Sequence, residues 1–331
     1  MSSIAIELTT RLPERIAKRL RLPLISAPML HVSGPDLVVA ACRAGVIGAF
    51  PTANPFLLKV SGGLDAWLTE MTSRLGDDLE TAAPICPNII MRNEDLNEHV
   101  EAVIRHGIEM VITSVGSPKP IMPRLREAGV FVFSDVATIE HARKAADSGV
   151  DGLVLLTAGA GGQTGWLNPF AYVRAVRSFF DGPIVLAGGV IDGVALRAAQ
   201  VLGCDLGYMG TKFIATRESL ADESYRNWLV QCSMDDVLMT KAFNGLMGSY
   251  LKPTIAAAGL DPDNLDESIS VARAKEQYGG GNSGPRRWIG MKSAGHSVSG
   301  VTAIQSVAEL VDQTAREFEG SRLEVLPARR R

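Results

Sequence analysis

Residues 183–214 read PIVLAGGVIDGVALRAAQVLGCDLGYMGTKFI. Two apolar runs in this stretch, at 183–189 and 206–214, enclose an amphipathic segment at 193–202. Near-continuous apolar runs of this length are typical of strands that are covered on both faces in a parallel sheet. The stretch therefore predicts a strand–helix–strand unit of an α/β fold.

The same unit recurs along the chain. Apolar runs that predict eight strands lie at 24–27, 45–50, 84–90, 110–115, 130–136, 152–157, 183–189 and 206–214. Helix-like segments follow at 35–43, 63–75, 96–105, 120–127, 139–146, 170–179 and 193–202, and a last one lies at 303–318. Glycines such as Gly129 and Gly203 close several of them, as helix C-caps do. Eight such units favour a closed TIM (β/α)₈ barrel over an open, doubly wound sheet.

The region 217–290 breaks this pattern. Helices are expected there at 224–233, 240–251 and 268–277, separated by turns rich in proline and glycine. We expect a smaller helical subdomain at 217–290, inserted after strand 8, with residues 1–216 and 291–331 forming the barrel. The glycine-rich run at 279–285 is either a bare linker or an edge of the active site.

Charge and composition exclude several classes of protein. The 331 residues carry a net charge of −3, which gives no basic field for binding nucleic acid. No apolar run approaches the ~18 residues of a membrane span. The first residues are charged and lack the apolar core of a secretory signal, so we expect a cytoplasmic protein. The four cysteines are far apart in the sequence, which predicts reduced thiols and no metal site.

The last two predicted strands end in residues that suit a phosphate group. Active sites of such barrels lie at the carboxyl ends of the strands. Gly188 and Gly189 end the seventh strand, and Gly210 and Thr211 lie in the eighth. Glycines let backbone N–H groups approach an anion closely, the helix that starts near Asp192 adds its positive end, and the threonine hydroxyl adds a donor. The alternative is that the glycines only make tight turns, but their pairing at these two strands favours phosphate binding.

The loop after the sixth predicted strand is rich in glycine. It reads TAGAGGQTGW at 157–166, and its glycines, including Gly162, indicate that the backbone passes a ligand closely or has to move. Gln163 offers an amide donor and acceptor but no titratable proton. It can therefore orient a substrate but cannot act as a general base.

Residues after two other strands suit a flat heterocycle. Pro28 and Met29 follow the first strand, and Asn88 lies in the third. An apolar wall and an amide donor would hold a planar ring, although a core methionine and a turn-capping asparagine explain the same residues.

Two titratable residues lie at the same end of the barrel. His296, in the segment KSAGHS at 292–297, is a candidate acid, base or flavin contact, or a surface histidine. Asp135, at the end of the fifth strand, is either a carboxylate on the rim or a cap of the helix that begins near Thr138, and the cap is the preferred interpretation.

Taken together, several motifs resemble the nitronate monooxygenase family, formerly called 2-nitropropane dioxygenases. The motifs are PLISAPM (23–29), PNI (87–89), AGAGGQTG (158–165), IVLAGGVIDG (184–193), MGTKFIATRE (209–218) and KSAGHS (292–297). The resemblance implies an FMN-binding TIM barrel with a smaller helical domain after strand 8. It implies that Gly188, Gly189, Gly210 and Thr211 hold the FMN phosphate. It also implies that Pro28, Met29 and Asn88 line the isoalloxazine ring and that the segment starting at Ser293 lies near it.

The chain departs from this family at two positions. Members place a histidine, which acts on the substrate, in the loop after strand 6, where this chain has Gln163. Asp135 lies where some relatives carry a lysine, and a carboxylate at this position makes the site less attractive to anions. The resemblance therefore implies a site in which removal of a proton from a neutral nitroalkane is impaired, whereas a nitronate is already an anion and needs no base.

Two activities fit these residues. The first is FMN-dependent oxidation of a nitronate or a similar stabilised carbanion with O₂. The alternative is an NAD(P)H-dependent flavin reductase or dehydrogenase acting on a quinone or an enoyl- or keto-acyl-CoA, in which the protein mainly positions the partners. A barrel that binds FMN or a sugar phosphate without catalysis is a third class, against which the glycine-lined loop argues. No GxGxxG motif opens a strand–helix unit to take a second nucleotide, so FMN rather than FAD is expected. The expected partners are a small-molecule substrate and, in the alternative, NAD(P)H; a homo-oligomer is not excluded.

Overall fold

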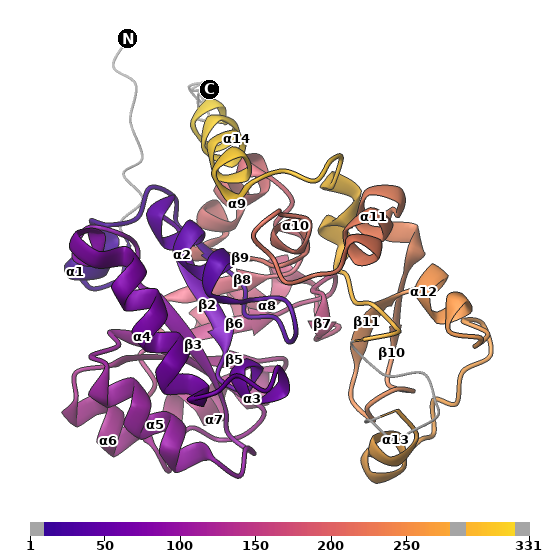
Figure 1. Ribbon diagram of the computed structural model, residues 1–331, viewed down its shortest axis with the longest axis horizontal. Coiled ribbons are helices and arrows are strands. Elements are labelled where there is room, and N and C mark those ends of the chain that lie inside the picture. The colour runs from indigo at the N-terminus through magenta and orange to yellow at the C-terminus, as the bar shows by residue number, and fades with distance from the viewer. Residues whose placement is uncertain (1–9, 279–288, 322–331) are drawn as a thin grey trace, which may run out of the picture.

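A computed structural model describes residues 10–278 and 289–321 (Figure 1). Its centre is a closed barrel of eight parallel strands, β1-β2-β3-β4-β5-β6-β8-β9, so the predicted TIM barrel is confirmed. The barrel strands are β1 (Leu24–Ser26), β2 (Ile47–Pro51), β3 (Ile85–Ile90), β4 (Met110–Ser114), β5 (Phe131–Val136), β6 (Gly152–Leu156), β8 (Ile184–Ala187) and β9 (Leu206–Met209). The eighth predicted strand is shorter than expected, because residues after Gly210 turn into the short helix α10 (Thr211–Ile214).

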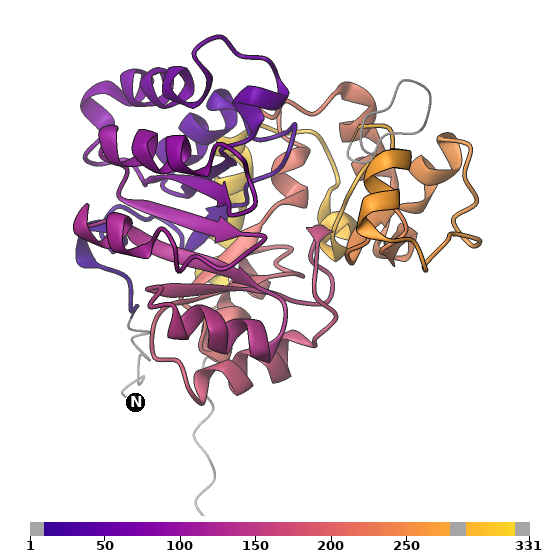
Figure 2. The same ribbon diagram turned by 90° about the horizontal axis from the view of Figure 1, so that it is seen from below.

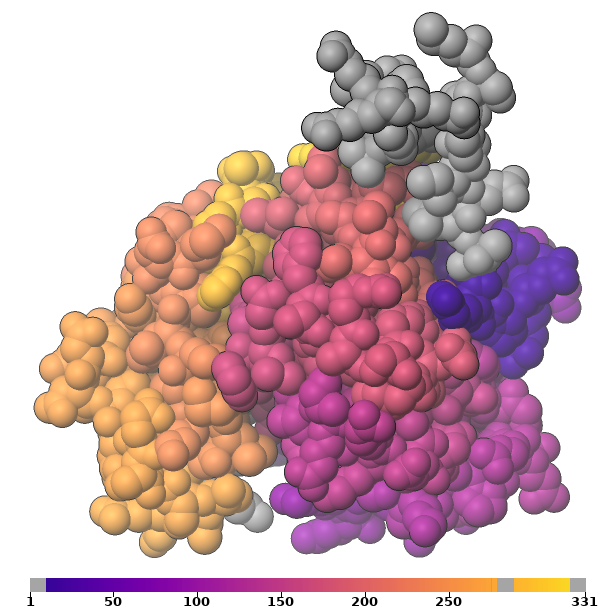
Figure 3. Space-filling view, turned by 180° about the vertical axis from the view of Figure 1, so that it is seen from behind, coloured from indigo at the N-terminus to yellow at the C-terminus, as the bar shows by residue number. Residues whose placement is uncertain are grey.

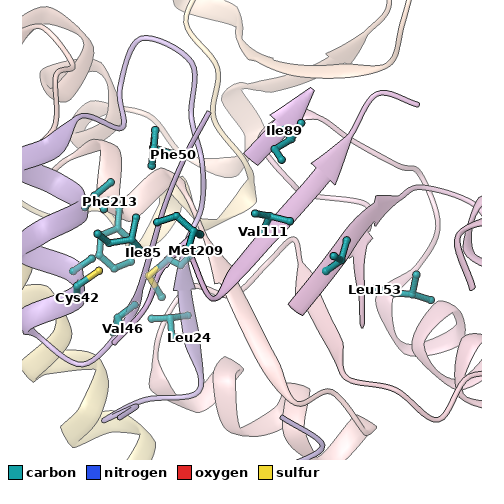
Figure 4. Packing of buried hydrophobic residues seen from close by; sticks show 14 of the residues in the cluster. Leu24, Cys42, Val46, Phe50, Ile85, Ile89, Val111, Leu153, Met209 and Phe213 are labelled. Carbon is teal, nitrogen blue, oxygen red and sulfur yellow. The ribbon is translucent and has the colours of Figure 1, made fainter. Parts of the chain in front are cut away.

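Helices surround the barrel on its outer side (Figures 1 and 2). They are α2 (Pro35–Arg43), α3 (Asn54–Leu57), α4 (Gly63–Leu75), α5 (Leu96–Arg105), α6 (Met122–Glu127), α7 (Ile139–Asp147), α8 (Pro169–Arg177), α9 (Gly193–Leu202) and α14 (Val307–Gly320). Figure 4 shows the apolar layer between strands and helices, where Leu24, Ile85 and Met209 meet Cys42 of α2. The four cysteines are buried free thiols. None of the described helices is long and apolar enough to cross a membrane.

The barrel interior is closed at the amino ends of the strands. Side chains such as Cys86, Phe133 and Leu206 fill it and form one cluster with Leu12 and Ile16, which belong to the segment of helix α1 (Glu14–Ala17). This segment is fixed to the amino ends, because the N–H of Arg11 donates to Asp205 directly before β9. Among the described residues, the interior is therefore open toward the carboxyl ends of the strands and closed at the amino ends.

The chain after α10 forms a lobe beside the barrel, orange in Figures 1 and 3. It contains α11 (Glu223–Gln231), β10 (Val237–Thr240), β11 (Gly248–Leu251), α12 (Lys252–Ala257) and α13 (Val271–Tyr278). Phe243 packs edge-on against Tyr250 and Tyr278 in an apolar cluster of its own. The limits of a subdomain at 217 and 290 stay a prediction, and the glycine-rich run at 279–285 lies outside the described residues.

One predicted helix in this lobe, at 240–251, is wrong. The segment instead forms an antiparallel hairpin of β10 and β11, which pair Thr240 with Gly248. Asn244 and Gly245 lie in its turn, and Gly245 has the left-handed φ of 71° that an Asn-Gly turn supplies. The edge of β11 then pairs with β7 (Gly162–Gln163) from the loop after β6, so this lobe reaches across to the barrel.

Candidate active site

The glycine pair after β8 forms an open cradle. Gly188 and Gly189 both have left-handed φ angles, 122° and 75°. A Cβ on Gly188 would collide with Thr157, but one on Gly189 would meet nothing within 4 Å. In the described part of the chain, the N–H groups of Gly189 and Val190 donate to no protein acceptor. Unpaired N–H groups beside open space are a site for an anion.

The glycine and threonine after β9 lie against other predicted site residues. A Cβ on Gly210 would be 3.4 Å from Sδ of Met29, so the ends of β9 and β1 are in contact there. The Oγ1 of Thr211 accepts a hydrogen bond of 2.9 Å from the N–H of Gly295. Its hydroxyl hydrogen therefore stays available to a ligand.

The N–H groups in the first turn of α9 were expected to face an anion in the cradle, but they are already paired. The N–H of Gly193 donates to the carboxylate of Glu317, and that of Ala195 donates to Asp192, which caps the helix. Because these donors already face carboxylates, an anion bound here would need its donors from the turns after β8 and β9.

Three polar atoms inside the barrel have no partner among the described residues. They are Nδ2 of Asn88, Oδ1 of Asp135 and the hydroxyl of Tyr208. Asn88 is 5% exposed, and its Oδ1 accepts a hydrogen bond of 3.0 Å from Ser114. Buried polar groups are normally paired, so these atoms indicate a missing ligand or water.

The preferred interpretation of Asp135 as a helix cap is wrong. Thr138 caps α7 instead, since its side chain accepts from the N–H of His141. Asp135 is an inward residue of β5, two positions after Phe133, which lies in the interior cluster. Burial raises the pKa of its carboxyl to about 7. Burial, and then the charge of Asp135, raises the pKa of Tyr208 well above its ordinary value.

The loop that follows β1 is held from α3. Asn54 is fully buried and donates to the carbonyls of Met29 and Ser33, while it accepts from the N–H of His31. This fixes Pro28 and Met29 at the carboxyl end of the barrel. His31 has a left-handed φ of 60°, a costly backbone for a residue with a side chain. Its pKa is lowered by burial and by Lys292.

The loop after β6 is tied to the segment around Ser293. The Oγ of Ser293 accepts from the N–H of Gly162 at 2.6 Å and donates to the carbonyl of Ser249 at 2.6 Å. Gly295 packs so closely that a Cβ would lie 2.5 Å from the carbonyl oxygen of Gly159. These contacts leave the exposed Gln163 in β7, next to Gly248 of β11.

His296 contacts the same loop at Gly159, from the segment that follows Ser293. Its N–H donates to the carbonyl of Gly159, and its ring lies beside that glycine while the residue stays exposed. Of the two residues predicted as catalytic, Gln163 thus lies within the strand-six loop, and His296 contacts that loop at Gly159 from another segment. Among the described residues no group of three or more His, Cys, Asp or Glu could hold a metal.

Sequence reasoning missed Tyr208, Ser114 and Asn54. A signal for Tyr208 was available, because it lies two residues before Gly210 and so faces the same side of the strand. Ser114 could have been found in the same way from the end of β4. No signal marks Asn54, because its role depends on a loop 21 residues earlier in the chain.

Comparisons with known proteins agree with this architecture. A model of the nitronate monooxygenase family matches residues 14–316. A nitronate monooxygenase from Paraburkholderia phytofirmans is 25% identical over 90% of this chain and 93% of its own length. An octahydro-1H-indene-4-carboxyl-CoA dehydrogenase from Rhodococcus jostii is 25% identical over 77% of this chain and 70% of its own.

Solved structures share the fold. FabK from Thermotoga maritima has a TM-score of 0.74 at 21% identity, covering 95% of this chain and 97% of its own. Nitroalkane oxidase from Streptomyces ansochromogenes has a TM-score of 0.74 at 21% identity, covering 93% and 99%. The family match spans most of the chain, barrel and lobe together. The chain therefore belongs to the nitronate monooxygenase family of flavin-dependent oxidoreductases.

Proposed function

We propose that the chain binds FMN at the carboxyl end of the barrel, with the phosphate between Gly188–Gly189 and Gly210–Thr211. The open, left-handed Gly189 with its unpaired N–H is the observation that carries this proposal. Two neutral donors, the N–H of Val190 and the hydroxyl of Thr211, complete the cradle. A single phosphate-sized cradle supports FMN over FAD.

The ring of the flavin would lie over the carboxyl end of the barrel interior, called the hollow below, which Asn88, Asp135 and Tyr208 line. Met29 and Pro28 supply an apolar wall there, and the unpaired Nδ2 of Asn88 supplies an amide donor. Gly162 and Ser293 hold the loop that covers this end, through the hydrogen bond between them. FMN, when bound, supplies two-electron oxidation of the substrate and reoxidation by O₂. The protein residues bind, orient and exclude water.

The proposed substrate is a nitronate or a similar stabilised carbanion. Such a substrate has already lost its proton, so a site with the amide Gln163 in the strand-six loop is sufficient for it. Gln163 would orient the substrate by hydrogen bonding. His296, whose N–H donates to the carbonyl of Gly159 in this loop, is the candidate proton acceptor or flavin contact.

Anaerobic titration tests the proposal. The purified protein is expected to be yellow, to release FMN on heating, and to be bleached by propionate-3-nitronate. Release of FAD or of no flavin contradicts the cofactor assignment. Bleaching by NADH or NADPH and not by the nitronate favours the reductase or dehydrogenase alternative, which the family match does not favour.

A further inference from the structure

Asp135 and Tyr208 face the hollow from two strands. Both are inward residues, since Phe133 and Leu206, two positions earlier on the same strands, lie in the interior cluster. Both keep some exposed surface, whereas most of that cluster is fully buried. Because the segment around Ile16 closes the amino end, this exposed surface faces the carboxyl end, where a ligand enters.

No cation compensates Asp135 among the described residues. Burial is the one cause that shifts the pKa of its carboxyl, and its Oδ1 has no partner. The titratable groups that interact with it are Cys86 of β3 and Tyr208 of β9. Burial holds the pKa of both well above their ordinary values, so both stay neutral near pH 7.

The neighbouring strands add no charge. The inward residues nearest to it on β4, β6 and β8 are Ile112 and Ser114, Val154, and Ala187, and none of them carries a charge. The charge of the hollow therefore depends on the protonation of Asp135. With a carboxyl pKa of about 7, it is a neutral acid below that pH and a carboxylate above it.

We propose that Asp135 is a specificity-determining residue whose proton controls the entry of anions. As a neutral acid it can donate a hydrogen bond to an anionic substrate in the hollow, and as a carboxylate it repels that substrate. This proposal rests on the proposed function in one respect, namely that the substrate binds in the hollow. Repulsion between two like charges a few ångströms apart in a partly buried site weakens binding by about tenfold or more.

Nitrate is a suitable probe, because it is a planar anion with the O–N–O geometry of a nitronate and is not oxidised. Its affinity for the purified holoenzyme is measured by calorimetry from about pH 5.5 to about pH 8.5, which brackets a carboxyl that titrates near neutrality. The native protein is expected to bind nitrate about tenfold more weakly at the upper end than at the lower end. Calorimetry does not depend on turnover.

The Asp135→Asn variant removes the titration and keeps the shape. Its nitrate affinity is expected to stay the same across the pH range and to be at least that of the native protein at low pH. Asp147→Asn is the matched control, because Asp147 is an exposed carboxyl at the far end of the helix that follows β5, and it is expected to keep the native pH dependence. Asp135→Ser replaces Asp135→Asn if that variant does not fold.

Infrared spectroscopy provides a second readout. A carboxylic acid C=O band should be present in the native protein below neutrality, fade as the pH rises through about 7, and be absent from Asp135→Asn. No titrating band, no nitrate binding at low pH, or pH-dependent binding that survives in Asp135→Asn would each overturn the proposal. A protein that shows these effects but contains no flavin instead contradicts the proposed function alone.

Discussion

The proposed phosphate cradle and the loop after β6 are both rich in glycine, but they are built in different ways. The cradle consists of two successive strand ends, Gly188–Gly189 and Gly210–Thr211, so its geometry follows from adjacent βα units. The strand-six loop depends on Ser293, which lies 131 residues from Gly162. The sequence alone could place the glycines of the first region at adjacent strand ends, whereas the contact that holds the second region needed the structure.

Filling the cradle is expected to have the largest effect. Gly189→Val places a branched side chain in open space where the phosphate is proposed to lie, at a φ of 75° that valine tolerates poorly. Loss of two charge-assisted hydrogen bonds would weaken FMN binding by about 10³-fold. Equilibrium dialysis of FMN with the refolded apoprotein measures this.

Gly129→Val is the matched control for this variant. Gly129 has a φ of 71° and equally open surroundings, but it lies in the turn between α6 and β5 at the amino end of the barrel. It should carry the same backbone strain and keep native FMN affinity. Equal loss of FMN in both variants, or full occupancy in Gly189→Val, would place the phosphate elsewhere.

A new base in the strand-six loop is expected to have the next largest effect. Gln163→His introduces an imidazole that can accept a carbon-bound proton, which an amide cannot do. We expect oxidation of a neutral nitroalkane to rise by roughly 10²-fold, the low end for a general base, because residue 163 is exposed. Oxygen consumption with the nitroalkane and with its preformed nitronate compares the two substrates, and the nitronate rate should change little.

The direction in which the gained activity changes with pH follows from the protonation of the new histidine. Only the neutral imidazole accepts a proton, so the gained activity should rise with pH through about 6.5 and then level off. Gln231→His, an exposed position on α11, serves as control and should gain nothing. Robust nitroalkane oxidation by the native protein would show that another base, such as His296 or His31, already serves the site.

The fold was predictable because its signals are local. Helices α2, α4, α5 and α9 begin and end where the apolar periodicity predicts, and Gly129 and Gly203 have the left-handed φ expected of helix ends. Each of these features depends on a few neighbouring residues. The residues proposed to form the cradle share that property, so the sequence alone could put them forward as candidates.

The two wrong predictions, the helix at 240–251 and the cap at Asp135, concern residues whose structure depends on distant segments. The hairpin at 240–251 looks amphipathic by itself, but its strand β11 is fixed by pairing with β7, far away in the sequence. Asp135 lies shortly before α7, which suggested a cap, and only the closure of the barrel shows that it faces inward. Sequence patterns do not carry such contacts between distant segments.

A steric test of the non-local region uses Gly295→Ala. The added methyl would lie 2.5 Å from the carbonyl oxygen of Gly159 and 2.7 Å from the nitrogen of Gly161, which are backbone atoms that cannot move alone. We expect a loss of about 2–4 kcal/mol in the free energy of unfolding. Gly320→Ala, with nothing within 4 Å, is the control and should be neutral in chemical denaturation. Equal stabilities would show that the strand-six loop is not held against residues 293–296.

The smallest expected effect concerns the hydroxyl that joins the loop to the lobe. Ser293→Ala removes the acceptor of the Gly162 N–H and the donor to Ser249, in a residue that is 9% exposed. Because the N–H of Gly162 is left without this partner, the free energy of unfolding should fall by about 1–2 kcal/mol. Ser178→Ala, whose exposed hydroxyl bonds only within its own turn, is the matched control and should change little.

Faster amide exchange of residues 159–165 in Ser293→Ala, with unchanged exchange of residues 186–190, would separate the loop from the cradle. Equal changes in both segments would instead mean that the two glycine-rich regions form one cooperative unit, and the distinction between them would fail.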